Sequence, residues 1–238
     1  MKKILAISIM VLCSLVSVAQ DQLIVDANAK LRTLNGSFNS IRISHAIKVV
    51  ITQSDTEGLA VSANEEKYME DIITELDGST LVIRLKNNSW TGKRNRQVKV
   101  YVSFKKLESL DISGASDVVT VGAIKQPSLR LDLSGASTLR GELETGTLSL
   151  DMSGASQLSL KGSAKVLKAD CSGASDMNAY DFTVDLANLN VSGASDIEIN
   201  VTKEIKAEAT GASSISYKGN ASVTNVRTSG ASSINKKS

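Results

Sequence analysis

The chain has 238 residues, enough for one or two domains with a sizeable core. The formal net charge is only +2, with 13 Lys/Arg against 10 Asp/Glu in residues 21–106 and 12 against 15 in residues 107–238, so the overall charge gives no sign of a nucleic-acid partner. Aromatic residues make up 3% and there is one proline, so the core must be built from Leu, Ile, Val and Ala, which favours a thin, regularly stacked core.

Residues 1–19 are typical of a secretory signal peptide. Two lysines precede an apolar run, Ile4–Val18, that is too short for a typical membrane span, and Ala19 is a small residue suited to a cleavage site. The alternatives are an uncleaved anchor or a lipid on Cys13, although Leu12 stands where a lipidation site has a small residue. No second apolar segment of spanning length follows. We therefore expect an exported protein of the periplasm or outer cell surface without a membrane span.

Residues 20–106 are predicted to form a β-rich N-terminal cap. "SIRISHAIKVVIT" alternates apolar and polar residues, and "DIITELDGSTLVIRL" is typical of a hairpin with a turn at Asp77-Gly78. Between them, "NEEKYMEDI" is expected to begin a short helix with Asn64 as its N-cap. His45 is the only histidine, so a histidine-paired metal site is excluded and a structural role is expected for it.

One loop of this segment, "KNNSWTGKRNRQ", contains the only tryptophan among basic residues. An exposed aromatic ring beside cations could grip a sugar or an anionic polymer. The candidate ligand-binding residues are Trp90, Lys93, Arg94 and Arg96. The alternative is a plain hairpin loop whose tryptophan folds back as a lid.

Residues 107–238 contain an internal repeat. The tetrapeptide SGAS occurs six times and TGAS once. The motif glycines are Gly114, Gly135, Gly154, Gly173, Gly193, Gly211 and Gly230. They are 18 to 21 residues apart, which is the signature of a solenoid.

The residues around each motif alternate with period two. Before the third motif, Leu150 and Met152 flank Asp151, and after it the polar Gln157 precedes Leu158. This pattern predicts a strand entering and a strand leaving each motif, each with one buried face. A leucine-rich repeat has a similar period, but the return stretches here are short and rich in glycine and β-branched residues. We therefore predict an all-β, right-handed β-helix or β-solenoid of about seven SGAS-marked rungs.

The motif itself is best explained as a stacked corner. Corners of successive rungs lie about 4.8 Å apart, so bulky side chains would collide, whereas glycine reaches positive φ without steric cost. The serines can bond turn backbone that the strand ladder leaves unpaired. A functional array of hydroxyl groups is the alternative. Cys171 occupies the same apolar position as Met152, so we expect a buried, unreactive thiol.

A column of carboxylates precedes the motifs. It consists of Asp111, Asp132, Asp151 and Asp170. Like charges on neighbouring strands repel, so the column requires solvent, hydrogen bonds from the motif serines, or a cation. Calcium needs six or more oxygens, which a single file of carboxylates does not supply.

The order of these features resembles a known family. "SFNSIRISHAIKVVITQ" and "DGSTLVIRL" precede repeats of the form apolar-Asp-apolar-SGAS-x-Ile/Leu, over roughly residues 34–234. This resembles the putative auto-transporter adhesin family with a head GIN domain, common in secreted proteins of Bacteroidetes. The resemblance implies a right-handed β-helix and an export destination, and it carries no catalytic residues. Unlike a true auto-transporter, the chain contains no membrane barrel to carry its head outward.

The leading functional hypothesis is therefore a non-enzymatic binding or adhesion protein of the cell envelope. Expected partners are a glycan or a cell-surface or matrix component, and a homo-oligomer is possible; no cofactor and no metal is expected. The alternatives are a structural element that assembles through its terminal strands, or a polysaccharide-acting enzyme. The best acid–base candidates for an enzyme are Asp181 and Asp185, about 13 Å apart if their segment is extended, which is too far for paired glycosidase carboxylates.

Overall fold

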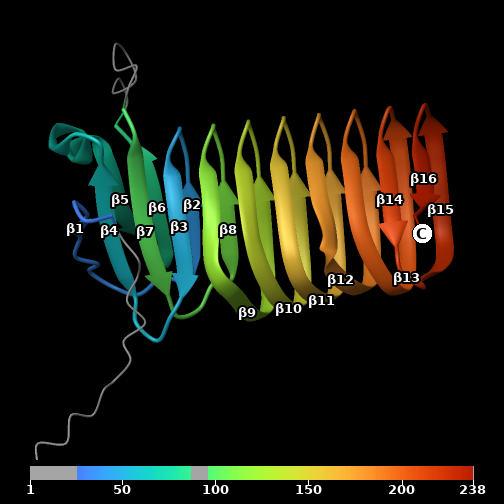
Figure 1. The fold of residues 1–238 in the computed structure, drawn as a ribbon, viewed down its shortest axis with the longest axis horizontal. Coiled ribbons are helices and arrows are strands. Elements are labelled where there is room, and N and C mark those ends of the chain that lie inside the picture. The colour runs from blue at the N-terminus through green and yellow to red at the C-terminus, as the bar shows by residue number, and fades with distance from the viewer. Residues whose placement is uncertain (1–25, 87–95, 238) are drawn as a thin grey trace, which may run out of the picture.

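The computed structural model describes residues 26–86 and 96–237. The predicted signal peptide and three of the four candidate loop residues, Trp90, Lys93 and Arg94, lie outside these ranges. Within them the chain forms a single stack of rungs, each with strand segments on the near and the far side, and a cap at one end (Figure 1). The elements are β1 (Lys30–Leu31), β2 (Ser40–Ile43), β3 (Lys48–Gln53), β4 (Gly58–Ala63), the 3-10 helix η1 (Glu66–Asp71), β5 (Ile72–Asp77), β6 (Thr80–Leu85), β7 (Val98–Phe104), β8 (Ser109–Ile112), β9 (Asp117–Leu133), β10 (Thr138–Met152), β11 (Gln157–Cys171), β12 (Asp176–Val191), β13 (Asp196–Gly211), β14 (Ser214–Lys218), β15 (Ser222–Gly230) and β16 (Ser233–Lys236).

The predicted β-solenoid is confirmed. Each of the strands β9 to β13 runs from one motif to the next and pairs in parallel with the equivalent strand of the neighbouring rung. The return stretches, which the sequence showed to be short and rich in glycine and β-branched residues, keep their pairing with the neighbouring rungs; Thr145, for example, lies opposite Ala164. We call the part of a rung that follows a motif its leaving limb and the part that leads into the next motif its entering limb.

The core is a stack of small apolar layers. On the leaving limb, Leu158 is 1% exposed whereas Gln157 is exposed. On the entering limb, Met152 and Cys171 lie opposite each other in register and are both buried. The period-two pattern therefore assigns the inward and outward faces correctly.

The motif corners bring backbones of neighbouring rungs unusually close. All seven motif glycines have positive φ, between 73° and 79°. From Ala136 onward, the alanine N–H of each motif donates to the glycine carbonyl of the preceding rung at 2.7–2.8 Å. A Cβ atom placed on any of the six motif glycines from Gly135 to Gly230 would lie 2.4–2.7 Å from the carbonyl oxygen of the preceding motif glycine. Only glycine satisfies both the φ angle and the contact.

In six of the seven motifs the second serine closes the corner from the inside; Ser137 instead lies 3.5 Å from the hydroxyl of Ser156. The hydroxyl of Ser156, which is fully buried, donates to the carbonyl of Ser153 at 2.7 Å. The same contact, at 2.7–3.0 Å, is made by Ser116, Ser175, Ser195, Ser213 and Ser232. These hydroxyls pair carbonyl groups that the strand ladder does not use.

The cap is threaded out of chain order. The rung of β2 and β3 lies between that of β6 and β7 and that of β8 and β9, and β4 and β5 add antiparallel strands on the outside. The predicted hairpin is present as β5 and β6, with Gly78 at φ 60°. The predicted helix is a 3-10 helix without a side-chain cap; Asn64 instead accepts a hydrogen bond from the backbone N–H of Gln97 at 2.9 Å. No helix within the described ranges is long and apolar enough to cross a bilayer.

His45 is an additional corner that the sequence pattern did not reveal. The segment Ser44–Ile47 lies opposite the first SGAS motif, and the N–H of Ala115 donates to the carbonyl of His45 at 3.0 Å. His45 has φ 74°, the value of the motif glycines. The His45 side chain is exposed to solvent.

We expect Gly154→Val to be far more destabilising than Ser156→Ala. The valine must adopt positive φ against the carbonyl of Gly135, and we expect this to lower the free energy of unfolding by about 3 kcal/mol or more. The alanine loses one buried hydrogen bond, worth about 1 kcal/mol. Urea melts of both variants measure this difference, and equal midpoints would contradict a stacked corner.

At His45, glycine should be tolerated and a β-branched residue should not. Positive φ is strained for a non-glycine residue, so His45→Gly is expected to leave the stability unchanged or raise it by up to about 1 kcal/mol. His45→Val should lower it by about 1–2 kcal/mol. Thermal melts that rank valine at or above glycine would show that this corner is not strained.

Candidate functional site

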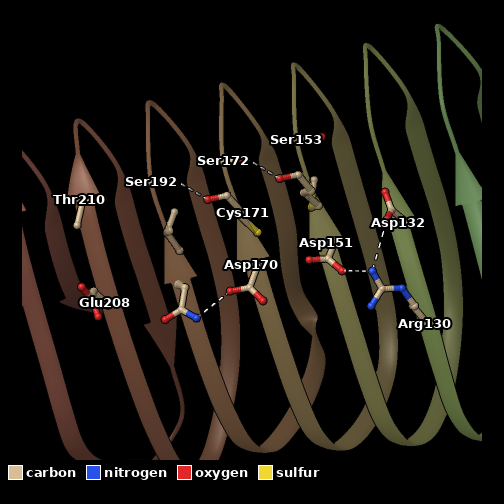
Figure 2. A pocket seen from close by; sticks show the side chains of 13 residues that line it. Arg130, Asp132, Asp151, Ser153, Asp170, Cys171, Ser172, Ser192, Glu208 and Thr210 are labelled. Carbon is tan, nitrogen blue, oxygen red and sulfur yellow. Dashed lines mark hydrogen bonds and ion pairs between the residues drawn. The ribbon is translucent and has the colours of Figure 1, made fainter.

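The outward face of the entering limbs carries a continuous polar column (Figure 2). It consists, in register, of Arg42, Asp111, Asp132, Asp151, Asp170, Asn190, Glu208 and Arg227. Two residues further on, each rung adds the first residue of its motif, a serine or threonine. We call the surface formed by the column and these hydroxyl residues the acidic flank.

Basic and amide groups interrupt the charge of the column. The guanidinium of Arg130 lies 2.5 Å from a carboxylate oxygen of Asp151 and 3.5 Å from one of Asp132. The amide of Asn190 donates to Asp170 at 2.8 Å. Donors on neighbouring strands therefore bind these carboxylates and offset the repulsion between like charges that lie opposite each other in register.

Asp111, at the cap end of the column, has a raised pKa. The main cause is burial of its carboxylate, followed by repulsion from Asp132, while Arg42 at 3.4 Å opposes the shift. Both burial and a neighbouring negative charge disfavour the ionised form of a carboxyl group, so the pKa of Asp111 rises.

The hydroxyl row is only partly used by the fold. Ser172 and Ser192 donate to carbonyl groups of the preceding rung at 3.4 and 3.5 Å, which are long, weak bonds. Ser172 is exposed and Ser192 is partly exposed, and both lie on the same face as the carboxylates (Figure 2). Each rung thus presents one carboxylate or amide and one hydroxyl group, repeated about every 4.8 Å.

The acidic flank is hollowed into an open groove of about 770 Å³. The groove crosses the rungs from Arg130 to Thr210. Its polar groups can accept hydrogen bonds from hydroxyl groups and, through Arg130, Asn190 and the serines, donate them. Among the described residues no three His, Cys, Asp or Glu side chains are grouped so that they could hold a metal ion.

Of the four candidate ligand-binding residues in the basic loop, only Arg96 lies in the described ranges. Its guanidinium is 1% exposed and pairs with Asp71 at 3.1 Å, and the carbonyl of Asp71 also accepts from the N–H of Lys86. Asp71 of the cap thus binds a residue at each end of the loop, Lys86 through its backbone and Arg96 through its side chain. A ligand contact by Arg96 would require the pair to open. Binding by Trp90, Lys93 and Arg94 stays a prediction.

The two enzyme candidates lie in unfavourable surroundings for acid–base chemistry. Asp185 accepts from Thr202 and pairs with Lys203, both at 2.9 Å. The hydrogen bond from Lys203, then that from Thr202, lowers the pKa of Asp185, whereas a general acid needs a raised value. Asp181 is 73% exposed and lies 3.8 Å from Lys161, so solvent surrounds it.

Cys171 is buried beneath the acidic flank, as its place in the repeat predicted. Burial, and then the charges of Asp170 and Asp151, raise the pKa of the thiol to about 12. The thiolate is therefore nearly absent at neutral pH, and the group acts as a small apolar side chain.

Sequence reasoning identified the carboxylates of the flank but missed the residues that balance them. Arg130 stands two residues before Asp132, so the same alternation that placed the carboxylates outward also placed this side chain beside them. Asn190 was visible as the amide that replaces a carboxylate in the column. The register between rungs, which brings Arg130 to the neighbouring Asp151, is the additional information from the structure.

The fold and flank define a β-solenoid with a repeated polar surface. The chain belongs to the family described as putative auto-transporter adhesin, head GIN domain, whose model matches residues 37–221. The resemblance inferred from the motifs is thus confirmed. No curated protein matches the sequence.

Solved structures share the fold at low identity. A putative adhesin from Bacteroides fragilis is 19% identical with a TM-score of 0.80, over 89% of this chain and 98% of that one. A putative adhesin from Parabacteroides merdae is 18% identical with a TM-score of 0.68, over 88% and 95%. A protein from Parabacteroides distasonis, described as a putative lipid binding protein, is 19% identical with a TM-score of 0.65, over 90% and 98%. At this identity the likeness shows the fold alone.

We expect Arg96→Ala to lower the free energy of unfolding by about 3 kcal/mol, because it removes one member of a charge pair whose side chains are only 1% and 16% exposed. Arg84→Ala is the matched control: it removes an exposed pair with Glu75 and should cost less than about 1 kcal/mol. Urea denaturation measures both. Equal losses would show that Arg96 is not a structural clasp.

Cys171 should resist alkylation in the folded protein. With the thiol pKa of Cys171 near 12, iodoacetamide at about pH 8 should leave the native chain, prepared without residues 1–19 and so without Cys13, unmodified and should label it once after unfolding in guanidinium. Intact mass gives the answer. Rapid labelling of the native chain would mean that the rung opens at this strand.

Proposed function

We propose that this protein is an exported, non-enzymatic binding protein of the cell envelope that adheres to a polyhydroxylated surface polymer through the acidic flank. The observation that carries the proposal is the flank itself: carboxylate, amide and hydroxyl groups in register over the rungs that line the groove. The family description supports adhesion, and the signal-like residues 1–19 support export.

A glycan fits this surface better than a cation or a polyanion. Sugar hydroxyl groups both donate and accept hydrogen bonds, and the flank supplies acceptors in its carboxylates and donors in Arg130 and Asn190. The ion pairs of Arg42 and Arg130 reduce the net negative charge that would attract a cation. The carboxylates would repel a polyanion.

Catalysis finds little support. An acid–base pair needs two groups whose surroundings push their pKa values apart, whereas repeated rungs offer similar surroundings. The irregular position Asp185 is held ionised by Lys203.

A lipid ligand, as in the printed description of one structural neighbour, also has less support. The large exposed apolar side chains of the described residues are spread over four strands, β1, β9, β12 and β15, and do not form the lining of the groove.

The test is an array of glycans and matrix proteins probed with the mature chain and two matched variants. Asp151→Asn with Asp170→Asn changes the acidic flank. Asp176→Asn with Asp196→Asn makes the same chemical change to exposed, in-register carboxylates of the leaving limbs.

Binding to a neutral glycan that falls at least tenfold in the flank variant and not in its control would support the proposal, since each lost charged hydrogen bond is worth about 1.5 kcal/mol or more, or about tenfold in affinity. Equal binding by both variants would refute the flank as the site. A release of reducing or unsaturated sugar from any polysaccharide that disappears in Asp185→Asn would refute the non-enzymatic assignment.

A further inference from the structure

The two ends of the solenoid are finished differently. At the N-terminal end the antiparallel strands β4 and β5, the 3-10 helix and residues 26–36 cover the first rung (Figure 1). Arg32 completes this cover by donating to the carbonyl groups of Met69 and Ile72 at 2.8 and 3.0 Å. At the C-terminal end β15 pairs only with β13 and β16 only with β14 among the described strands.

The last layer of the core is therefore uncovered. Val223 and Val226 lie in register with the buried Ile205 and Ala207, so they belong to the inward columns, yet they are 49% and 40% exposed. All nine residues of β15 are exposed. Its outer edge presents backbone N–H and C=O groups without a strand partner, which is a template for a further strand.

The last rung carries only positive charge. Residues 222–237 contain Arg227, Lys236 and Lys237 and no acidic residue. Arg227 has Glu208 opposite it in register, but Lys236 lies opposite the uncharged Tyr217. The outermost rung is thus a basic edge with two exposed valines.

We propose that this edge accepts an extended, acidic segment of a partner protein, which pairs with β15 as an additional strand. Its backbone would bond to the free edge, its apolar residues would cover Val223 and Val226, and its carboxylates would face Arg227. Lys236 of β16 adds positive charge at the same end of the solenoid. This site is distinct from the acidic flank and does not depend on glycan binding.

A second copy of the chain is a poorer occupant. Two terminal rungs placed edge to edge would bring Arg227, Lys236 and Lys237 of one copy against the same basic residues of the other. Like charges opposite one another destabilise strand pairing, and basic residues on an edge are a common guard against self-association. The same charges select for an acidic strand.

The experiment uses three blocked peptides of nine residues, the length of β15, titrated against the full mature chain by fluorescence anisotropy at about 0.15 M salt. The first alternates glutamate with valine and threonine. The second has lysine in place of each glutamate. The third keeps the glutamates but is N-methylated at every other residue, so one edge cannot donate hydrogen bonds.

We expect only the first peptide to bind. The double variant Arg227→Glu with Lys236→Glu should weaken it about tenfold or more and should favour the lysine peptide. Lys165→Glu with Lys168→Glu, an equal charge change at exposed positions in the middle of the solenoid, should leave binding unchanged.

Four results would overturn the proposal: no binding of the glutamate peptide, equal binding of the lysine peptide, equal binding of the N-methylated peptide, or equal loss in both double variants. Sedimentation of the free chain as a dimer that Val226→Lys dissociates would assign the edge to a second copy, and would also overturn it. Circular dichroism melts of the variants confirm that each is folded before its titration is read.

Discussion

The architecture depends on the close approach of backbones at the motif corners. The alanine N–H of one motif donates to the glycine carbonyl of the preceding rung at 2.7–2.8 Å. The glycine that precedes this alanine lies so close to the same carbonyl group that it has no room for a Cβ atom. This contact fixes the spacing and register of each rung against its neighbour, because a slip of one residue would place a side chain in the backbone contact. The buried serine then holds the corner by pairing a carbonyl group within the same motif. The identical motif recurs because the constraint recurs at every rung.

The same constraint determines what the surface can do. Because the corners are in register, the outward side chains of the entering limbs form columns. An attraction or repulsion between two side chains of a column therefore recurs between each pair of neighbouring strands. The column of carboxylates is tolerated because Arg42, Arg130 and Asn190 lie within it or beside it. Such a surface offers many similar weak contacts in place of one specialised centre, which suits adhesion to a repetitive polymer. The irregular parts of the molecule are its ends, where one cap is complete and the other edge is open.

Much of this could be predicted from the sequence, because repetition makes a local pattern informative. The period of the glycines predicted the solenoid, and the alternation around Leu158 and Cys171 predicted which side chains are buried. Non-local pairing could not be predicted in the same way. The rung of β2 and β3 is inserted between two later rungs, and its corner contains His45 where the others have glycine, so no repeat marks it. Arg96 is basic and close to a tryptophan in sequence, but its partner Asp71 is 25 residues away and only the fold brings them together.

The most direct measurement is the affinity of the chain for a length series of oligosaccharides, cut from whichever polymer it binds on the array. The groove in the acidic flank repeats its groups over the five strands β9 to β13, so the account predicts that affinity rises with each added sugar and levels off only when the ligand spans the groove. The Asp151→Asn and Asp170→Asn changes should flatten that rise. Full affinity for a single sugar or a disaccharide would contradict the account, because it would place recognition in one local pocket and not in the repeated surface.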